Sequence, residues 1–142
     1  MSDGDCVFCK IITGDIPGYT VYESSTVTGF LDVNPLSMGH TLVVPNEHHE
    51  QLQDLPTHQA TDLWRGVHDL LPAIESAVDA DASTIGVNNG EASGQEIPHV
   101  HVHIVPRFYG DGGNPIHAVG GRSPTVTEDD FETIQQGIEG SL

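Results

Sequence analysis

The sequence predicts an α+β fold in which helices cover one face of an antiparallel sheet. Short runs that suit strands stand in both halves of the chain, and a long stretch with helical spacing of apolar residues lies between them. A length of 142 residues suits a compact unit with its own core, so we expect one domain over residues 1–142.

The N-terminal third predicts a helical turn followed by strands. Residues 6–13 are expected to form a short helical turn that ends at Gly14. Three runs then have strand character, at residues 19–23, 27–31 and 40–44. Ser24 and Ser25 suit a tight hairpin between the first two runs, and Pro45 closes the third, which is apolar enough to be a central strand.

The middle of the chain predicts a helix and the rest of the sheet. Apolar side chains recur at helical spacing over residues 58–79, which indicates one long amphipathic helix. Two more strands are expected, at residues 84–88 and 99–105. Pro106 is expected to stop the second of these.

Residues 110–142 predict an irregular segment and a C-terminal helix. The stretch 110–124 is rich in Gly, Asn and Pro, which disfavour regular structure. Thr127 with Asp130 resembles a helix-start box, and apolar residues at helical spacing follow it.

The charge balance limits the kinds of partner that the chain is expected to bind. The chain has 21 acidic and four basic residues, a formal net charge of -17. So few cations argue against long nucleic acid as a partner, because phosphate backbones bind Lys and Arg. We interpret the acid excess as a solubility adaptation to the salty cytoplasm of a halophile, where a Debye length of about 3 Å makes self-repulsion tolerable. The sequence has neither an apolar stretch of about 20 residues nor an export signal, so we expect a cytoplasmic protein without membrane contact.

Three histidines at two-residue intervals dominate the C-terminal third. In a strand His99, His101 and His103 would line one face, with the aliphatic residues between them turned into a core. Each imidazole is a nucleophile, proton carrier or metal ligand near neutral pH. The row could therefore be a solvated strand face, a metal site, or a site of covalent catalysis by one ring.

The loop before this row favours phosphate chemistry over a metal centre alone. Gly90 and Gly94 allow backbone N–H groups to approach an anion closely, and the Asn88 and Gln95 amides are neutral hydrogen-bond donors. A fourth histidine, His40, opens the predicted central strand. Several imidazoles beside neutral donors suit a bound phosphate.

Together these residues closely resemble the histidine triad (HIT) family of nucleotide hydrolases and transferases. The resemblance covers roughly residues 6–109 and rests on four segments, at residues 30–32, 39–45, 88–95 and 99–105. It implies a HIT-like fold: a five-stranded antiparallel sheet with a long helix and a C-terminal helix, forming a homodimer whose sheets join edge to edge. It also implies cleavage at the α-phosphate of purine nucleotide conjugates, namely nucleoside phosphoramidates, acyl adenylates or dinucleoside polyphosphates.

The resemblance assigns catalytic roles residue by residue. His101 matches the family nucleophile, which forms a covalent nucleotidyl-histidine intermediate. His103 and Gln95 match positions that contact the α-phosphate and neutralise its charge in the transition state. His40 matches a histidine that assists the site.

It assigns a nucleotide pocket as well. Asn88 matches a polar residue near the same phosphate, and Asp32 matches the carboxylate that binds the ribose hydroxyls. Phe30 and Val33 fall where the base is sandwiched. Phe30 and Val33 could instead be core residues, and Asp32 could merely start a turn.

The roles of Glu96 and Arg107 are undecided, and the identity of the substrate depends on them. Glu96 stands where eukaryotic branches of the family have a small hydroxyl residue, and a carboxylate there disfavours a second negative charge. The preferred leaving group is therefore undecided. Arg107 could reach a distal phosphate or could cap the end of the sheet.

Cys6 and Cys9 supply two thiolates at a common zinc spacing, although this pair alone is equally compatible with redox chemistry or accident. The resemblance to prokaryotic HIT proteins that begin with this motif implies a structural zinc completed by His48 and His99. The adjacent His49 is an alternative to His48. No organic cofactor is expected.

Two other functions stay open at this point. The chain could be a nucleotide-binding regulatory protein whose hydrolysis is incidental. It could also be a zinc-stabilised interaction module in which the histidine row serves the metal.

Overall fold

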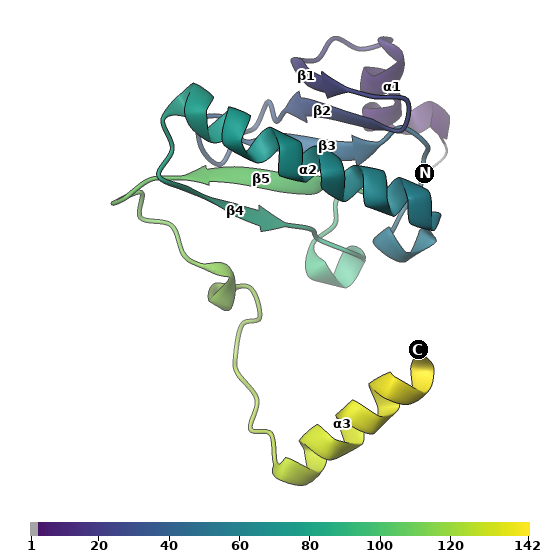
Figure 1. The fold of residues 1–142 in the computed structure, drawn as a ribbon, viewed down its shortest axis with the longest axis vertical. Helices are drawn as coiled ribbons and strands as arrows, with labels where there is room; N and C mark the ends of the chain where they lie inside the picture. Colours follow the sequence, from purple (N-terminus) through teal and green to yellow (C-terminus); the bar gives the residue numbers. More distant parts are fainter. Residues whose placement is uncertain (1–2) are drawn as a thin grey trace.

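A computed structural model describes residues 3–142 and has a five-stranded antiparallel sheet at its centre (Figure 1). The strands are β1 (Thr20–Glu23), β2 (Val27–Leu31), β3 (Thr41–Pro45), β4 (Ala82–Gly86) and β5 (Val102–Arg107), in the spatial order β1-β2-β3-β5-β4. The helices are α1 (Val7–Thr13), α2 (Thr57–Val78) and α3 (Glu128–Ser141). The α+β fold with an antiparallel sheet of five strands is confirmed.

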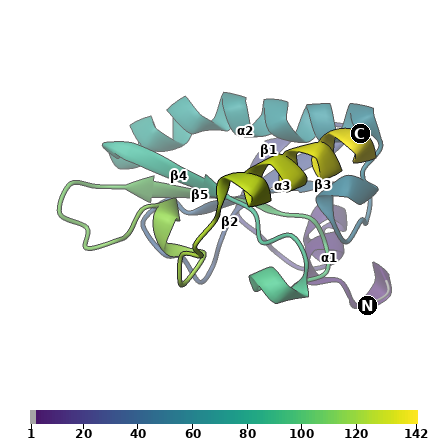
Figure 2. The ribbon, with the colours of Figure 1, turned by 90° about the horizontal axis from the view of Figure 1, so that it is seen from below.

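Helix α2 lies across one face of the sheet and builds the larger core (Figure 2). Its buried apolar residues follow the predicted helical spacing and are Leu63, Val67, Leu70 and Ile74. They pack on Val27, Val43, Val102 and Ile104 of the sheet and on Val100, which lies just before β5. The predicted helix at 58–79 is thus correct to within one residue at each end.

Helix α1 lies against the opposite face and covers only part of it (Figure 2). A smaller core forms here from Phe8 with Phe30, Leu42 and Val44 of the strands. The helix ends where Gly14 adopts the left-handed conformation, as the sequence predicts. The remainder of this face is left for a cavity.

The last strand starts later and runs further than expected. β5 begins at Val102 rather than at residue 99, because His99 and Val100 bond to Ile97 and His49 instead of to a neighbouring strand. The alternation of faces still holds, since the aliphatic residues of this segment lie in the α2 core. Pro106 does not stop the strand.

Pro106 is tolerated because its missing N–H faces no strand. β3 begins at Thr41, opposite Ile104, so β5 has no strand neighbour on that side at Pro106. The Pro106 carbonyl instead accepts a hydrogen bond from the Ser37 hydroxyl at 2.8 Å. A proline without a ladder bond to lose does not break a strand.

Strand β4 begins two residues earlier than predicted and ends at Gly86 rather than at residue 88. Asp79 ends α2 in a left-handed conformation, which turns the chain directly into the strand. Ala82 then pairs with Arg107 and Gly86 with His103. Alanine and serine have weak strand propensity, so the sequence pattern hides this start.

After β5 the chain leaves the sheet as an arm, which we define as residues 108–142 (Figure 1). Arg107 anchors its base: Nε and Nη2 donate to the Asp111 carboxylate at 2.8 and 3.1 Å, and Nη1 donates to the Thr84 hydroxyl at 3.0 Å. Of the two roles considered for Arg107, it therefore caps the end of the sheet.

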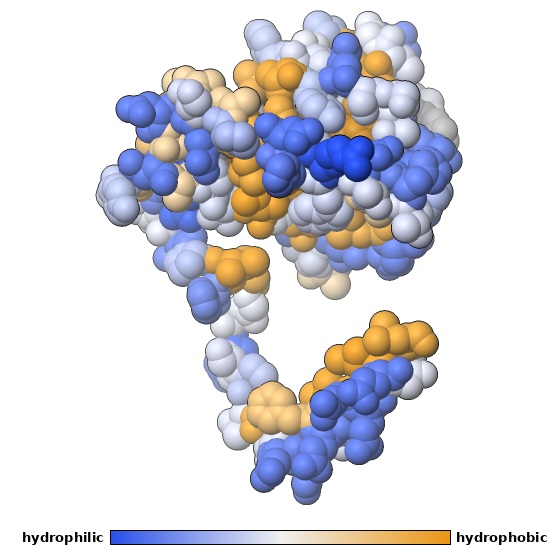
Figure 3. Space-filling view, viewed as in Figure 1, coloured by the Kyte–Doolittle hydropathy of each residue, from blue (hydrophilic) through white to orange (hydrophobic). Residues whose placement is uncertain are grey.

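The predicted C-terminal helix is present as α3. The Thr127 hydroxyl accepts from the Asp130 N–H at 3.1 Å and the Asp130 carboxylate accepts from the Thr127 N–H, a capping box. Figure 3 shows an apolar stripe along α3, whose residues Phe131, Ile134 and Ile138 are all exposed. The rest of the visible face is largely hydrophilic.

None of the helices between residues 3 and 142 combines the length and apolar character that crossing a bilayer requires.

Candidate active site and metal group

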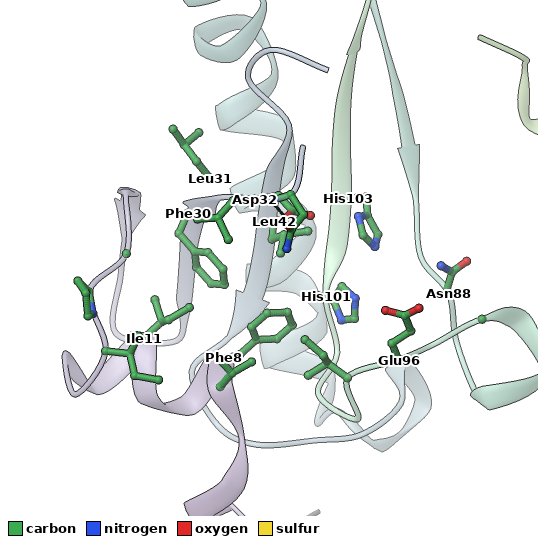
Figure 4. Close-up of a pocket in the computed structure, with 18 residues that line it drawn as sticks. Phe8, Ile11, Phe30, Leu31, Asp32, Leu42, Asn88, Glu96, His101 and His103 are labelled. Atoms are coloured by element: carbon green, nitrogen blue, oxygen red, sulfur yellow. Dashed lines mark hydrogen bonds between the residues drawn. The ribbon is translucent and has the colours of Figure 1, made fainter. Parts of the chain in front are cut away.

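A cavity of about 520 Å³ opens on the face of the sheet that α1 leaves free (Figure 4). Six of the predicted site residues line it: Phe30, Asp32, Val33, Asn88, His101 and His103. They come from β2, from β5 and its N-terminal extension, and from the loops after β2 and β4. The topology therefore brings together residues that are up to 73 positions apart in the sequence.

The His101 ring is held in one protonation state by the backbone. Its Nδ1 lies 2.7 Å from the carbonyl oxygen of His99, which can only accept, so Nδ1 carries the proton. Nε2 is then left with a free electron pair. Burial lowers the pKa of His101, so this ring is neutral at pH 7.

A chain of hydrogen bonds gives His103 the opposite arrangement. The backbone N–H of Leu36 donates to Nδ1 of His40 at 3.0 Å, which puts the His40 proton on Nε2. His40 Nε2 donates to Nδ1 of His103 at 2.9 Å, so the His103 proton is on Nε2. His103 thus offers a donor where His101 offers an electron pair.

Burial also sets the protonation state of the hydrogen-bonded histidines, His40 and His103. It lowers the pKa of His103 to about 4, with smaller contributions from His101 and His40 that Asp32 partly offsets. Burial also lowers the pKa of His40, again against the attraction of Asp32, whose carboxylate lies 3.7 Å from His40 Nε2. All these imidazoles are neutral at pH 7.

The predicted metal ligands converge on one point. Nδ1 of His99 lies 3.3 Å from Cys6 Sγ, 3.5 Å from Cys9 Sγ and 3.2 Å from His48 Nδ1, and Cys9 Sγ lies 3.4 Å from His48 Nδ1. A tetrahedral ion with standard zinc bond lengths has edges of about 3.3–3.8 Å between such donors. The four residues, Cys6, Cys9, His48 and His99, therefore fit a metal ion.

The orientation of His99 suits a ligand. Its Nε2 lies 2.9 Å from the carbonyl oxygen of Pro45, so the proton is on Nε2 and the Nδ1 electron pair faces the thiols. His99 is fully buried, which lowers its pKa to about 4 and keeps it neutral. His49, the alternative to His48, lies outside the group, with its Nε2 3.4 Å from a Glu47 carboxylate oxygen.

Asp32, His40 and His103 also bring possible ligand atoms within 4.8 Å of one another. This set is unsuited to a metal because the Leu36 N–H occupies one His40 nitrogen and the proton occupies the other. A metal in the catalytic cavity is thus disfavoured by the hydrogen bonds, whereas the Cys6 group is arranged for one.

Known proteins of one family match this chain in sequence. The HIT domain family matches the chain over residues 13–110, more than half of its length. The chain belongs to the HIT family. An uncharacterised HIT-like protein of Methanocaldococcus jannaschii is 45% identical over 107 residues, 75% of this chain and 82% of that one. An adenosine 5'-monophosphoramidase of Saccharomyces cerevisiae is 34% identical over 105 residues, 74% of this chain and 64% of that one.

Solved structures of HIT proteins match the fold closely. A HIT family protein from Bacillus subtilis has a TM-score of 0.83 and 34% identity, covering 97% of each chain. A zinc-bound histidine triad family protein from Mycobacterium smegmatis has a TM-score of 0.73 and 29% identity, covering 99% of this chain and all of that one. The HIT fold of this chain is therefore shown.

Two predicted nucleotide contacts also have structural duties in this HIT protein. Phe30 is almost fully buried and lines the cavity, with its ring centroid 5.4 Å from that of Phe8. Asp32 Oδ1 accepts from the Asn34 N–H at 2.9 Å, which forms the turn after β2. Val33 is 71% exposed at the rim and is not a core residue.

Gln95 is placed differently from the histidines. Its Oε1 accepts from the Gly90 N–H at 2.8 Å, and its Nε2 donates to the carbonyls of Glu50 at 2.7 Å and Ile97 at 3.1 Å. The amide thus holds the loop that carries Asn88, and Gln95 is absent from the cavity lining. Its contact with the α-phosphate stays a prediction.

Sequence reasoning missed the contribution of α1 to the cavity. Phe8 packs edge-on against His101 with ring centroids 5.0 Å apart, and Ile11 lines the same end. Phe8 stands between Cys6 and Cys9, so its position follows once the two thiols are tied to the sheet. Glu96, whose role was open, lines the cavity beside His101 and Asn88 (Figure 4).

The hydrogen-bond chain predicts an unusual titration for His103. Because its pKa is lowered to about 4 from 6.5, His103 stays neutral and protonated at Nε2 as the pH falls from 7 to about 5. Long-range ¹H–¹⁵N correlation spectra through a pH titration measure both the tautomer and the midpoint. The His40→Ala variant loses the donor to Nδ1 and is expected to show mixed tautomers. A midpoint near 6.5, or an Nδ1–H tautomer in the wild type, would contradict this structure of the site.

Proposed function

We propose that this chain hydrolyses or transfers nucleoside monophosphate groups from purine nucleotide conjugates, with His101 as the nucleophile. The observation that carries the proposal is the pair of opposite tautomers: a free Nε2 electron pair on His101 and an Nε2–H on His103, with ring centroids 5.0 Å apart. An electron-pair donor beside a hydrogen-bond donor suits attack on a phosphate.

The proposed reaction has two displacements at the α-phosphorus. His101 Nε2 attacks the phosphorus and forms a P–N bond while the bond to the leaving group breaks, and the leaving group keeps the electron pair and takes up a proton from solvent. A nucleotidyl-histidine remains. The Nε2–H of His103 donates to a non-bridging oxygen and stabilises its charge in the transition state. Water then attacks the phosphorus and loses a proton to solvent, while the P–N bond breaks and its electron pair returns to His101 Nε2, which releases the nucleoside monophosphate.

The cavity supports a nucleotide as the substrate. Its buried end, formed by the Phe8 and Phe30 rings, offers an apolar surface for a purine base, and Asp32 is available for the ribose hydroxyls. Phosphoramidates, acyl adenylates and dinucleoside polyphosphates all present an α-phosphate that bears a leaving group. The phosphoramidase among the relatives favours the first of these classes.

The proposal predicts that His101→Ala is folded but inactive. We expect the loss in kcat/KM for adenosine 5'-phosphoramidate to be at least about a thousand-fold, because the nucleophile is gone. Mass spectrometry of wild type quenched in denaturant at alkaline pH, where the P–N bond of the adduct survives, is expected to show a gain of one AMP on His101. The matched control is His58→Ala, an exposed histidine on α2, which should leave turnover unchanged.

Two outcomes would contradict the catalytic role. An AMP adduct on another residue would reassign the nucleophile. Wild-type turnover no greater than that of His101→Ala, with nucleotide binding intact, would instead favour a regulatory nucleotide-binding protein.

We also propose that the Cys6, Cys9, His48 and His99 group holds a structural zinc ion. A donor set of two sulfurs and two nitrogens at tetrahedral spacing suits zinc, and four protein ligands leave no open position for an activated water. A zinc-bound HIT structure supports the choice of metal. The zinc would tie α1 to the segment that carries the nucleophile.

The zinc proposal predicts different effects of replacing two neighbouring histidines, His48 and His49. Freshly purified wild type is expected to contain about one zinc per chain by elemental analysis, the stoichiometry of a closed four-ligand site. His48→Ala should lose the zinc and unfold at lower temperature, whereas His49→Ala should keep it. Wild-type protein with almost no zinc, or loss of zinc from His49→Ala alone, would refute the assignment.

A homodimer is the third part of the proposal. A helix of 14 residues such as α3 is marginal on its own, and its apolar stripe has no core beneath it. The alignment with the Bacillus subtilis structure covers 97% of this chain and so includes the arm. Within residues 3–142 the outer edge of β4 has no strand beside it. We propose that a second copy covers the stripe and that the two sheets meet at this edge.

The acid excess sets the conditions for this dimer. Two chains of charge -17 repel each other unless salt screens them, so we propose that the protein works in a salty cytoplasm. Sedimentation equilibrium in about 2 M KCl is expected to give a dimer that dissociates in about 0.1 M KCl, where the Debye length is longer.

The interface is tested in the same experiment. Ile134→Asp should weaken association by about tenfold or more in 2 M KCl, because it puts a charge into buried apolar surface. Gln136→Asp adds the same charge to the opposite side of α3 and should leave the dimer intact. A monomeric wild type at micromolar concentration in high salt would refute the proposal.

A further inference from the structure

Among residues 3–142, the side chains that line the catalytic cavity include carboxylates but no lysine or arginine. Asp32 and Glu96 are the charged residues among those that line it. The four basic residues of the chain lie elsewhere: Lys10, Arg65, Arg107 and Arg122. Arg107, the strongest candidate to reach a distal phosphate, is held by Asp111 at the base of the arm. A polyanionic leaving group would therefore find no counter-charge in this cavity.

The two ends of the cavity differ in burial. Phe8 and Phe30 close one end and are at most 5% exposed, whereas Glu96 is exposed and stands on the other side of His101 from these rings (Figure 4). With the base at the closed end and the α-phosphate at His101, the leaving group extends into the open end. The Glu96 carboxylate lies beside its path.

We infer that Glu96 selects the leaving group by charge, so that the preferred substrates are nucleoside phosphoramidates whose amine part carries a further positive charge. The inference rests on the proposed function and names its substrate class. A carboxylate at the rim attracts an ammonium group and repels a carboxylate or phosphate group on the leaving group. At a separation of about 6 Å near a protein surface, each unit charge changes the interaction by about three- to tenfold or more.

This role differs from that of the other carboxylate. Asp32 Oδ1 accepts from the Asn34 N–H and Oδ2 lies near His40, and the remaining lone pairs of this carboxylate are assigned to the ribose hydroxyls rather than to the leaving group. Glu96 follows Gln95, whose amide fixes the loop through three backbone groups. The loop thus presents the Glu96 carboxylate from a fixed backbone position.

The test uses three AMP phosphoramidates that share the same P–N bond and differ only in the far end of the amine. The amines are 1,6-diaminohexane, hexylamine and 6-aminohexanoate, which end in a cation, a neutral methyl group and an anion. We measure kcat/KM for each at low salt. The wild type is expected to prefer the cationic over the anionic amide by at least about tenfold, since two unit charges separate them.

Two variants and a salt series identify the source of the preference. Glu96→Gln removes the charge without changing the shape, and is expected to reduce the cation-to-anion ratio to about threefold or less. Ratios within one variant cancel any loss that all three substrates share. Glu91→Gln, in the same loop but outside the cavity lining, should keep the wild-type ratio. Raising KCl to about 2 M should compress the wild-type ratio, as charge screening requires.

The outcomes separate the two proposals. If all three amides are cleaved through an AMP adduct on His101 at equal rates, or if Glu96→Gln and salt leave the ratio unchanged, the role of Glu96 is refuted and the catalytic proposal stands. If none is cleaved and no adduct forms, both are refuted.

Discussion

The hydrogen bond from His101 Nδ1 to the His99 carbonyl decides the chemistry of this site. A histidine in water exchanges its proton between the two ring nitrogens, and only the deprotonated nitrogen can attack phosphorus. At 2.7 Å the carbonyl keeps the proton on Nδ1 and leaves Nε2 ready. The proton of His103, two residues further along the chain, is set the other way by His40. Backbone geometry thus gives two identical side chains complementary roles.

The candidate metal ligands are connected to this hydrogen bond through His99. His99 contributes its carbonyl to His101 and its ring to the two thiols, while its Nε2 is tied to Pro45 at the end of β3. The segment before β5 has no strand partner at this point, so side-chain ties replace the missing ladder bonds. The Cys6 group also links α1 to this segment, and Phe8 of α1 lies beside His101. A distortion of the metal group would therefore reach the tautomer of His101 through a single residue.

Much of this arrangement could be predicted from the sequence, because the spacing of apolar residues along a strand or helix indicates which face is buried. The alternation around His101 separated a core face from a site face, and the helical spacing located α2 to within one residue. The resemblance to HIT proteins pointed to the four residues that fit a metal ion, with His49 left as an alternative to His48. What the pattern missed depends on tertiary contacts. Pro106 continues β5 because β3 starts only at Thr41.

The remaining gaps are of the same kind. Ring protonation at His101 and His103 depends on which carbonyl or N–H a fold brings near, and no spacing rule contains that. Phe8 lines the cavity because α1, which carries it, packs on the sheet through the smaller core. From the sequence, the Gln95 amide is a neutral donor that could bind a phosphate. In the fold it is hydrogen-bonded to backbone groups of Gly90 and Glu50. Predicting a residue type was possible in each case, whereas predicting its bonding partner was not.

The absence of cations from the cavity lining bears on the kind of phosphate that fits. Neutral imidazoles can donate to one developing negative charge, but they supply no counter-charge for several. In the proposed reaction, the α-phosphorus of a nucleoside phosphoramidate carries one negative charge and would meet His103 as a donor and His101 as the attacking group. Each further anionic group would approach Asp32 or Glu96 without compensation. The uncompensated carboxylates thus support the proposal that the preferred substrates carry little negative charge.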